Sequence, residues 1–279
     1  MKRLIATALT VAAVLTIALI SGPAGAQTTT DVYVVHGLNL DGQTAQTDGG
    51  TNVTVCANGA ELIGDFEFGQ IVGPTALTSG TAVDIVVYGG ANVDCADPGQ
   101  ANALITQSVT PTGGAVALVA TSAANTLALT PYPLNSDCVD EGSGRLTAAH
   151  ASGDTPEVTV LVAGDPVGNL TFGNSLDADL PAASYDVQVN LGDTAVVGPA
   201  SIPVAAQANT LVFVVGNIAG DDGSTPVVPL VGEDQLEQCE TTTTTTTAGD
   251  TTTTVAPAPS AVAPATATQS GAAPLAITG

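Results

Sequence analysis

Short apolar runs of four to eight residues, separated by Gly, Asp, Asn and Pro, fill the chain between Asp31 and Cys239. Some runs alternate apolar and polar positions, as in VTVLV from Val158 and YDVQV from Tyr185. Others are continuously apolar, and no stretch keeps the 3.6-residue period of an amphipathic helix for long. Alternation and short β-branched runs are typical of β-strands. The pattern therefore predicts an all-β fold.

The strand pattern occurs twice along the chain. Both copies have a histidine at the end of the opening strand, then a VTV strand, then a Phe-Gly pair, in the same order. The matching positions are His36 and His150, Val53 and Val158, and Phe68-Gly69 and Phe172-Gly173. We therefore predict two tandem β-sandwiches of about 100 residues each. They occupy residues 27–139 and 140–239.

A family resemblance lies in the segment RLTAAHASGDTPEVTVLVAGDPVGNLTFGN, Arg145 to Asn174. It resembles the bacterial secreted domain-of-unknown-function family 4397 (DUF4397), which has a strand ending in a His-Ala-Ser segment, a following strand and a Phe-Gly turn. The second copy fits this pattern better than the first, whose segment after His36 is longer and more polar. The resemblance implies tandem immunoglobulin-like antiparallel β-sandwiches on an exported protein. It brings no catalytic residues.

The N-terminal segment, residues 1–26, contains two cations, an apolar run from Leu4 to Ile20, and the small residues Ala24-Gly25-Ala26. This order is the three-part pattern of a secretory signal peptide. We expect cleavage between Ala26 and Gln27. An uncleaved membrane anchor is the alternative, because an apolar run of this length nearly spans a bilayer.

Removal of the signal peptide leaves one cation, Arg145, against 26 acidic residues. Nucleic acids and anionic membranes are both bound through Lys and Arg side chains that meet phosphate groups. The composition therefore predicts no nucleic-acid partner and no anionic membrane surface. We interpret the acidic residues as a solvated surface that keeps an exported protein dispersed. Cation binding or a salty habitat is the alternative.

Four cysteines in an exported chain predict disulfides, and four cysteines allow three pairings. In the repeat alignment Cys56 and Cys95 fall on Leu161 and Val197, so both positions become apolar together in the second copy. The other two cysteines flank the second copy, Cys138 before it and Cys239 after it. We predict the pairs Cys56–Cys95 and Cys138–Cys239. A metal or redox site is disfavoured, because Cys-x-x-Cys is absent and both histidines lie far in sequence from any cysteine.

Common catalytic motifs are absent: Gly-x-Ser-x-Gly, His-Glu-x-x-His, the P-loop and Gly-x-Gly-x-x-Gly do not occur. We predict no catalytic residue, no metal site and no cofactor. His36 and His150 are interpreted as side chains that support the fold by bonding a neighbouring loop. Carboxylate pairs such as Asp177 and Asp179 could serve glycosidase chemistry, but we interpret acid pairs as turn formers.

Two binding chemistries were considered for the loops and strands. An aromatic sugar platform is disfavoured, because the chain has no Trp and its aromatic residues occupy strand or repeat positions typical of core packing. They include Phe68, Phe172, Tyr185 and Phe213. Calcium binding stays open, because GDDGS from Gly220 and DCVDEG from Asp137 cluster carboxylates, although no Asp-x-Asp-x-Asp-Gly loop is present.

Residues 240–274 are rich in Thr, Ala and Pro and contain almost no large apolar residues, which predicts a disordered stalk. The last five residues resemble the Leu-Ala-x-Thr-Gly sorting signal of class E sortases in high-GC Gram-positive bacteria. They are Leu275, Ala276, Ile277, Thr278 and Gly279. The resemblance implies cleavage after Thr278 and linkage of Thr278 to peptidoglycan, with sortase and peptidoglycan as partners.

A sorting signal continues into an apolar segment and a basic tail, so we expect the sequence to be cut short after Gly279. Release of the protein is the alternative. We therefore expect a non-catalytic secreted protein, displayed on the wall of a Gram-positive-type bacterium, for adhesion or wall structure. The alternatives are a released extracellular module that binds a small ligand or cation and, third, an enzyme. The sequence leaves the extracellular ligand unknown.

Overall fold

The computed structural model describes residues 28–38, 52–99, 101–123, 126–216, 228–236, 238–239 and 268–270. The predicted signal peptide and the LAITG motif lie outside the described residues. The regular elements of the described residues are all β-strands, which confirms the all-β prediction. The described residues contain no helix that is long and apolar enough to cross a membrane.

The first eight strands form two four-stranded sheets, which together we call the first unit. One sheet has the order β4 (Ile71–Thr78), β1 (Thr29–Val35), β7 (Gly114–Ala123) and β8 (Thr126–Leu134). The other has the order β3 (Ala60–Phe66), β2 (Val53–Ala57), β5 (Val83–Gly89) and β6 (Ala103–Val109). Strands β1 and β7 run parallel, and every other pair of neighbours in these two sheets is antiparallel.

The next eight strands form a second unit with the same strand order, each strand number being raised by eight. Its first sheet has the order β16 (Val228–Gln235), β15 (Ala208–Val215), β9 (Ser143–His150) and β12 (Ser175–Pro181). Its other sheet has the order β11 (Asp165–Leu170), β10 (Val158–Val162), β13 (Ala183–Leu191) and β14 (Thr194–Val204). Strands β9 and β15 form the parallel pair. The shared order gives the repeat seen in the sequence a common architecture.

One further strand, β17 (Thr268–Ser270), pairs antiparallel with β12 at the edge of the second unit. These three residues belong to the segment that the sequence predicts as a disordered stalk. In this place the stalk segment therefore adds a short strand to the folded body.

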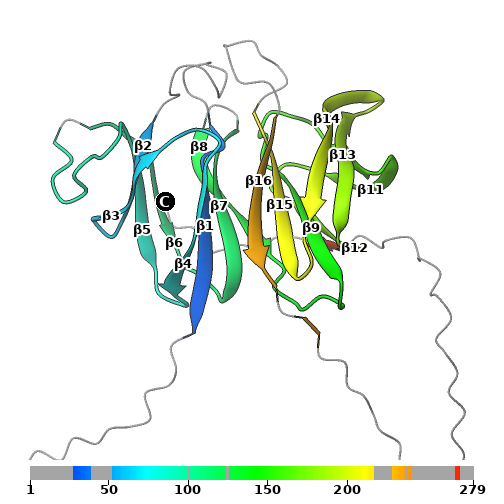
Figure 1. Ribbon diagram of the computed structural model, residues 1–279. Helices are drawn as coiled ribbons and strands as arrows, with labels where there is room; N and C mark the ends of the chain where they lie inside the picture. The colour runs from blue at the N-terminus through cyan, green and yellow to red at the C-terminus, as the bar shows by residue number, and fades with distance from the viewer. Residues whose placement is uncertain are drawn as a thin grey trace, which may run out of the picture.

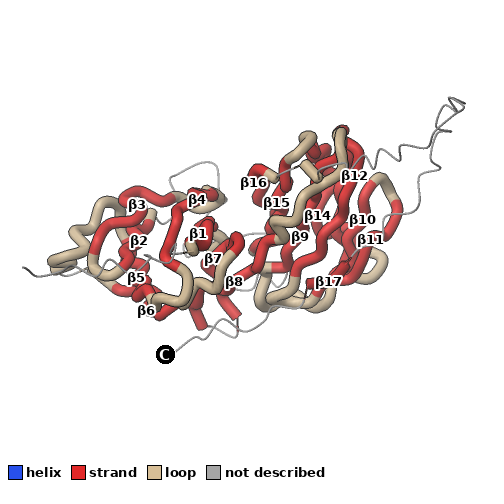
Figure 2. Tube along the Cα trace, turned by 90° about the horizontal axis from the view of Figure 1, so that it is seen from below, coloured by secondary structure: helices blue, strands red, loops and turns tan. Residues whose placement is uncertain are grey.

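The four sheets are stacked in layers, with three apolar cores between them. One core lies inside each unit, and the third contains side chains from both units. Alternate residues of the central strands face opposite cores: Val34 of β1 belongs to the first unit's core, whereas Val35 belongs to the shared core. Figure 1 shows the two middle sheets facing each other, β1, β7 and β8 on one side and β16, β15 and β9 on the other. Figure 2 shows the same neighbours from below.

This layering explains the two kinds of apolar run in the sequence. The middle strands β7, β9 and β15 are buried on both faces and are almost continuously buried along their length. An outer strand such as β10 buries Val158, Val160 and Val162 but leaves Thr159 and Leu161 partly exposed. Strands covered on both faces are expected to be continuously apolar, and strands covered on one face to alternate.

Candidate functional site

The contact between the two units combines an apolar core with hydrogen bonds, and we call it the seam. Its apolar part buries Tyr33, Val35, Phe68, Ala117, Val119 and Tyr132 of the first unit against Ala149, Ala151, Leu211, Phe213, Val215 and Leu230 of the second. The rings of Tyr132 and Phe213 meet edge to face, with centroids 6.1 Å apart, an arrangement that aromatic pairs prefer. The seam is packed like a domain core, so the two units form one body.

Two tyrosine hydroxyls add hydrogen bonds across the seam. Tyr132 Oη donates to the backbone oxygen of His150 at 2.6 Å, and Tyr33 Oη donates to Asp234 Oδ1 at 2.5 Å. Burial raises the pKa of both phenols, and the hydrogen bond with Asp234 raises that of Tyr33 further. Both hydroxyls therefore stay protonated and serve as donors.

Two glycines allow the units to approach closely. A Cβ on Gly153, in the second unit, would lie 2.1 Å from the backbone oxygen of Ser122 in the first. A Cβ on Gly232 would lie 2.9 Å from Ile71 Cδ1. Gly153 lies in a turn and Gly232 lies in β16. Neither glycine has a positive φ, so close packing rather than backbone conformation accounts for each of them. Sequence reasoning missed this role, because a glycine that permits a contact has the same one-letter signal as a glycine in a loop.

Arg145 anchors the polar end of the seam. Its Nε and Nη2 bind Asp179 Oδ1 and Oδ2 at 2.7 and 3.1 Å. Its Nη1 donates to the backbone oxygens of Asn135 and Asp137 at 2.9 and 3.1 Å. Asn135 and Asp137 belong to the connection between β8 and β9. Arg145 is 3% exposed. It is the one Lys or Arg in the sequence outside residues 1–26, and it fixes this connection to the second unit.

Asp177 lies beside this pair and faces the same side of β12. Thr147 Oγ1 donates to Asp177 Oδ1 at 2.6 Å. Burial raises the pKa of Asp177, although the hydrogen bond from Thr147 and the charge of Arg145 act in the opposite direction. Asp177 and Asp179 therefore lie on a strand and support the seam. Their interpretation as turn formers was wrong, because they are alternate residues of β12 and share the face on which they bind Thr147 and Arg145 of β9.

Both histidines occupy the same backbone motif. In the first unit Gly69 N donates to His36 O at 3.0 Å, and in the second Gly173 N donates to His150 O at 3.0 Å. The two glycines have φ values of +87° and +83°, a conformation that favours glycine. The repeated histidine and Phe-Gly pair therefore form one structural motif, in which the turn returns to the end of the opening strand.

The two imidazole rings have different surroundings. His150 Nδ1 accepts a hydrogen bond from Ser152 N at 3.3 Å, and His150 Nε2 bonds Pro156 O at 3.1 Å. These partners require a neutral ring protonated on Nε2, and burial lowers the pKa of His150. His36 instead packs against Phe66 and Phe68, at centroid distances of 5.3 and 6.1 Å. The expected bond to a neighbouring loop is present at His150.

The two cysteine pairs predicted from the sequence lie at disulfide distance. Cys56 and Cys95 have Cα atoms 5.8 Å apart. This bond holds the β5–β6 loop over the outer sheet of the first unit, where Thr54 Oγ1 donates to Gly90 O at 2.9 Å. The alignment of Cys95 with Val197 was wrong, because Cys95 lies in this loop whereas Val197 lies in β14. The second unit has only a short turn between β13 and β14 and needs no tether there.

The second disulfide encloses the second unit. Cys138 and Cys239 have Cα atoms 4.9 Å apart and are separated by 101 residues. Val139 and Gln238 form a parallel bridge beside the bond, and Cys239 N donates to Val139 O at 2.9 Å. All strands from β9 to β16 lie between the two cysteines. Two disulfides are typical of exported proteins.

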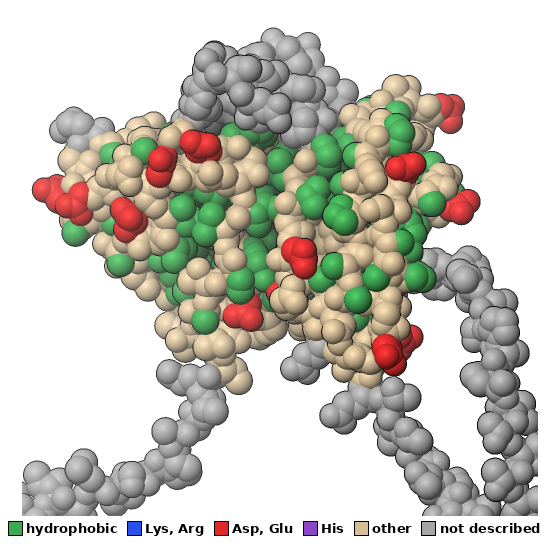
Figure 3. Space-filling model, in the orientation of Figure 1, with side chains coloured by type: hydrophobic (Ala, Val, Ile, Leu, Met, Phe, Trp, Pro, Cys, Tyr) green, Lys and Arg blue, Asp and Glu red, His purple; other side chains and the backbone are tan. Residues whose placement is uncertain are grey.

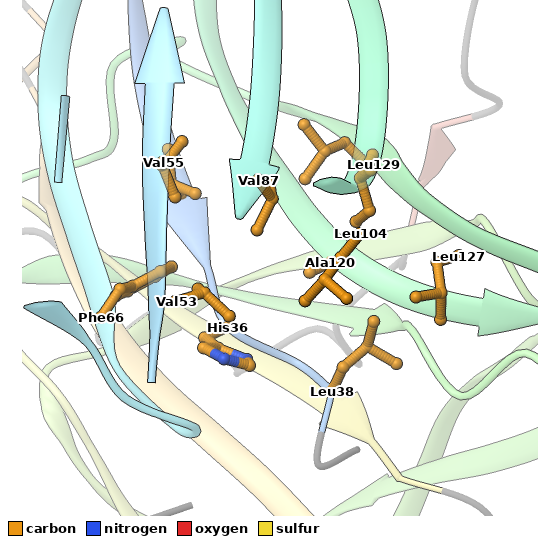
Figure 4. A pocket seen from close by; sticks show the side chains of 12 residues that line it. His36, Leu38, Val53, Val55, Phe66, Val87, Leu104, Ala120, Leu127 and Leu129 are labelled. Atoms are coloured by element: carbon orange, nitrogen blue, oxygen red, sulfur yellow. The ribbon is translucent and has the colours of Figure 1, made fainter. Parts of the chain in front are cut away.

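Two hollows could hold a ligand. An apolar cavity inside the first unit is lined by His36, Leu38, Phe66, Ala120 and Leu127, among others (Figure 4). It leaves ≈ 20 Å³ for the centre of a water-sized sphere, which is enough for one small group. A wider surface hollow of ≈ 480 Å³ lies at the outer sheet of the second unit, lined by Ser184, Tyr185, Asp186, Gln188 and Pro199.

Charge and aromatic side chains add no further site among the described residues. Over that part of the chain, no three His, Cys, Asp or Glu side chains gather as a metal site would require. The loop from Gly220 lies outside the described residues. Acidic side chains are scattered over the face shown in Figure 3. Phe68 and Phe213 are buried as expected, whereas Phe172 and Tyr185 are only partly buried.

Comparison with known proteins identifies one family. Residues 44–161 match the family model described as "Domain of unknown function (DUF4397)". No curated protein matches the chain. The matched range extends from before β2 to Leu161 within β10 and thus includes strands of both units. The chain therefore contains a DUF4397 domain, found at residues 44–161.

Proposed function

We propose that this protein is a non-catalytic surface protein, in which the two units form a rigid body displayed on a stalk for adhesion or wall structure. Its partners are a sortase and peptidoglycan at the C-terminal end and an extracellular ligand at the folded body. In the sequence, the signal-peptide pattern and the LAITG motif support export of the protein and its attachment to the cell wall. The two all-β units, built from antiparallel-rich sheets, are compatible with β-sandwich domains, which supports the tandem arrangement that the family resemblance implies.

The observation that carries the proposal is the placement of the second disulfide. Cys239 is the last residue before the Thr-rich segment, and it is bonded to Cys138 at the junction of the two units. The polar side chains with perturbed pKa values, Tyr33, Tyr132, His150 and Asp177, all have structural partners at the seam or in the neighbouring loop. The Cys138–Cys239 bond thus stabilises the folded body at the point where the predicted stalk would be attached.

A released module that binds a small ligand is the second candidate. It is supported by the apolar cavity beside His36 in the first unit. At the equivalent place in the second unit, the His150 ring is instead hydrogen-bonded to Ser152 N and Pro156 O. The cavity accepts only a small apolar group, so this activity would suit a short alkyl or methyl-bearing ligand.

Cell fractionation of a class E sortase-bearing bacterium that expresses the full-length gene tests the proposal. The protein should be released from the wall by muralytic enzymes as monomer-sized bands, because Lys2 is the only lysine and leaves with the signal peptide. Thr278→Ala should move the protein to the medium or membrane fraction, whereas the control Thr266→Ala should not. Wild-type protein found only in the medium would support the released module instead.

A further inference from the structure

Tension from the C-terminal end of a displayed protein first meets the three-residue edge strand β17 on β12. Once β17 has detached, the tension enters the folded body through Cys239, where the predicted stalk segment begins. From there the chain offers two routes to the first unit. One route runs through β16 and back along the chain to β9. The other crosses the Cys138–Cys239 bond directly to Asp137 and β8.

We propose that the Cys138–Cys239 disulfide is a mechanical bypass, which carries tension from the stalk to the junction and leaves the second unit outside the load path. The 101 residues between the cysteines form a covalently closed loop. Force applied on one side of Cys138 and beyond Cys239 cannot lengthen that loop while the bond is intact. Such a load exists only on an anchored protein, and in this respect the proposal rests on wall display.

The junction is reinforced on both sides of the bond. On one side Arg145 binds the backbone oxygens of Asn135 and Asp137, the last residues before Cys138. On the other side the Val139–Gln238 bridge and the bond from Cys239 N to Val139 O hold the two chain segments side by side. Gln207 Nε2 also donates to Gln238 Oε1 at 2.9 Å. The force therefore enters at a point where hydrogen bonds already hold the segments around Cys138 and Cys239 together.

The first unit has no equivalent bracket. Its disulfide joins Cys56 and Cys95, which are 39 residues apart and both internal to the unit. Tension between β1 and Cys138 can therefore extend most of the first unit, while only the Cys56–Cys95 loop is protected. Strand β1 begins and β16 ends at the lower end of the body in Figure 1.

Single-molecule stretching of the protein from Gln27 to Gly279, held at both termini, tests the bypass. In the oxidised wild type we expect extension of the first unit and of the segment after Cys239, but not of the loop that the Cys138–Cys239 bond closes. The variant Cys138→Ser/Cys239→Ser should gain an additional length of roughly 350 Å, because about 3.3–3.6 Å is released per residue of the opened loop. The matched variant Cys56→Ser/Cys95→Ser should gain only about 130 Å, from its shorter loop.

A second measurement covers the case in which the serine variant does not fold. A thiol reductant added to the stretched wild-type protein should then release two additional lengths, roughly 350 Å from the Cys138–Cys239 loop and about 130 Å from the Cys56–Cys95 loop. Absence of the step of roughly 350 Å would overturn the bypass. The terminal handles replace the wall, so this result is independent of the fractionation outcome. Failure of wall attachment with an intact bypass would overturn display alone.

Discussion

The two units have the same strand order but are closed and braced in different ways. At the end of its opening strand the first unit has His36 beside an apolar cavity. The second unit has His150 in the same place, and its ring is bonded by Ser152 and Pro156. The first unit's disulfide secures a loop over its outer sheet, whereas the second unit's disulfide joins its two ends.

This difference distinguishes features that the shared fold needs in both units from features that stabilise only one unit. The histidine and Phe-Gly turn occur in both units because they complete the same strand connection. The braces differ in place: the second unit's disulfide joins its two ends, next to the Thr-rich segment, whereas the first unit's disulfide closes a loop inside that unit. The fold is therefore repeated, and the stabilising bonds are specific to each copy.

The largest expected effect comes from removing the disulfides one at a time. Chain-entropy arithmetic gives a loss of about 5 kcal/mol in unfolding free energy for Cys138→Ser/Cys239→Ser, and about 4 kcal/mol for Cys56→Ser/Cys95→Ser, because the first closes the longer loop. Urea unfolding followed by far-UV circular dichroism measures both. A larger loss in the second variant would show that the tethered loop matters more than the enclosing bond.

The next effect concerns the seam. Phe213→Ala should lower the unfolding free energy by about 3–5 kcal/mol, because Phe213 is 1% exposed and packs against Tyr132. Phe66→Ala, inside the first unit's core, is the matched control with a similar loss. Only Phe213→Ala should also increase the radius of gyration in X-ray scattering, since of the two phenylalanines only Phe213 lies in the seam. An unchanged radius would indicate that the units stay docked without the ring.

A pH series compares the two histidines. The pKa of His150 is lowered in the folded protein by burial, so unfolding takes up a proton below the ordinary histidine pKa of about 6.5. Stability should therefore fall as pH decreases from 7 toward the lower folded pKa, with a slope of at most one proton. The slope of the unfolding free energy against pH should be smaller in His150→Gln than in the wild type. The variant His36→Gln serves as the comparison. Midpoints of urea unfolding between pH 8 and 5 measure it, and a slope unchanged by His150→Gln would contradict the neutral buried ring.

The smallest expected effect tests the cavity. Ala120 follows Val119, which pairs with Val35, and Val214 follows Phe213, which pairs with Ala149. Ala120 and Val214 are therefore equivalent positions. Ala120→Val should fill part of the cavity and raise the unfolding free energy by about 0.5–1 kcal/mol. Val214→Ala should instead cost about 2 kcal/mol. Destabilisation by Ala120→Val would mean that the cavity has no room for two methyl groups.

Local pattern determined the strands, their repetition and the cysteine pairs. Alternating runs such as that of β10 and continuous runs such as that of β15 record how many faces of each strand are buried. Two matching sets of strand and turn signals were sufficient to predict a repeat. The positions of Cys138 and Cys239 on either side of the second copy predicted their pairing, even though the alignment of Cys95 with Val197 was wrong.

Only the tertiary structure decided that the two units share a seam. A continuously apolar strand is buried on both faces, but its sequence does not indicate which sheet packs against the second face. Gly153 and Gly232 permit contacts with residues of the other unit, and Arg145 and Asp179 meet across two strands. Such contacts join residues far apart in the chain, so they depend on how whole sheets stack, which no local period encodes.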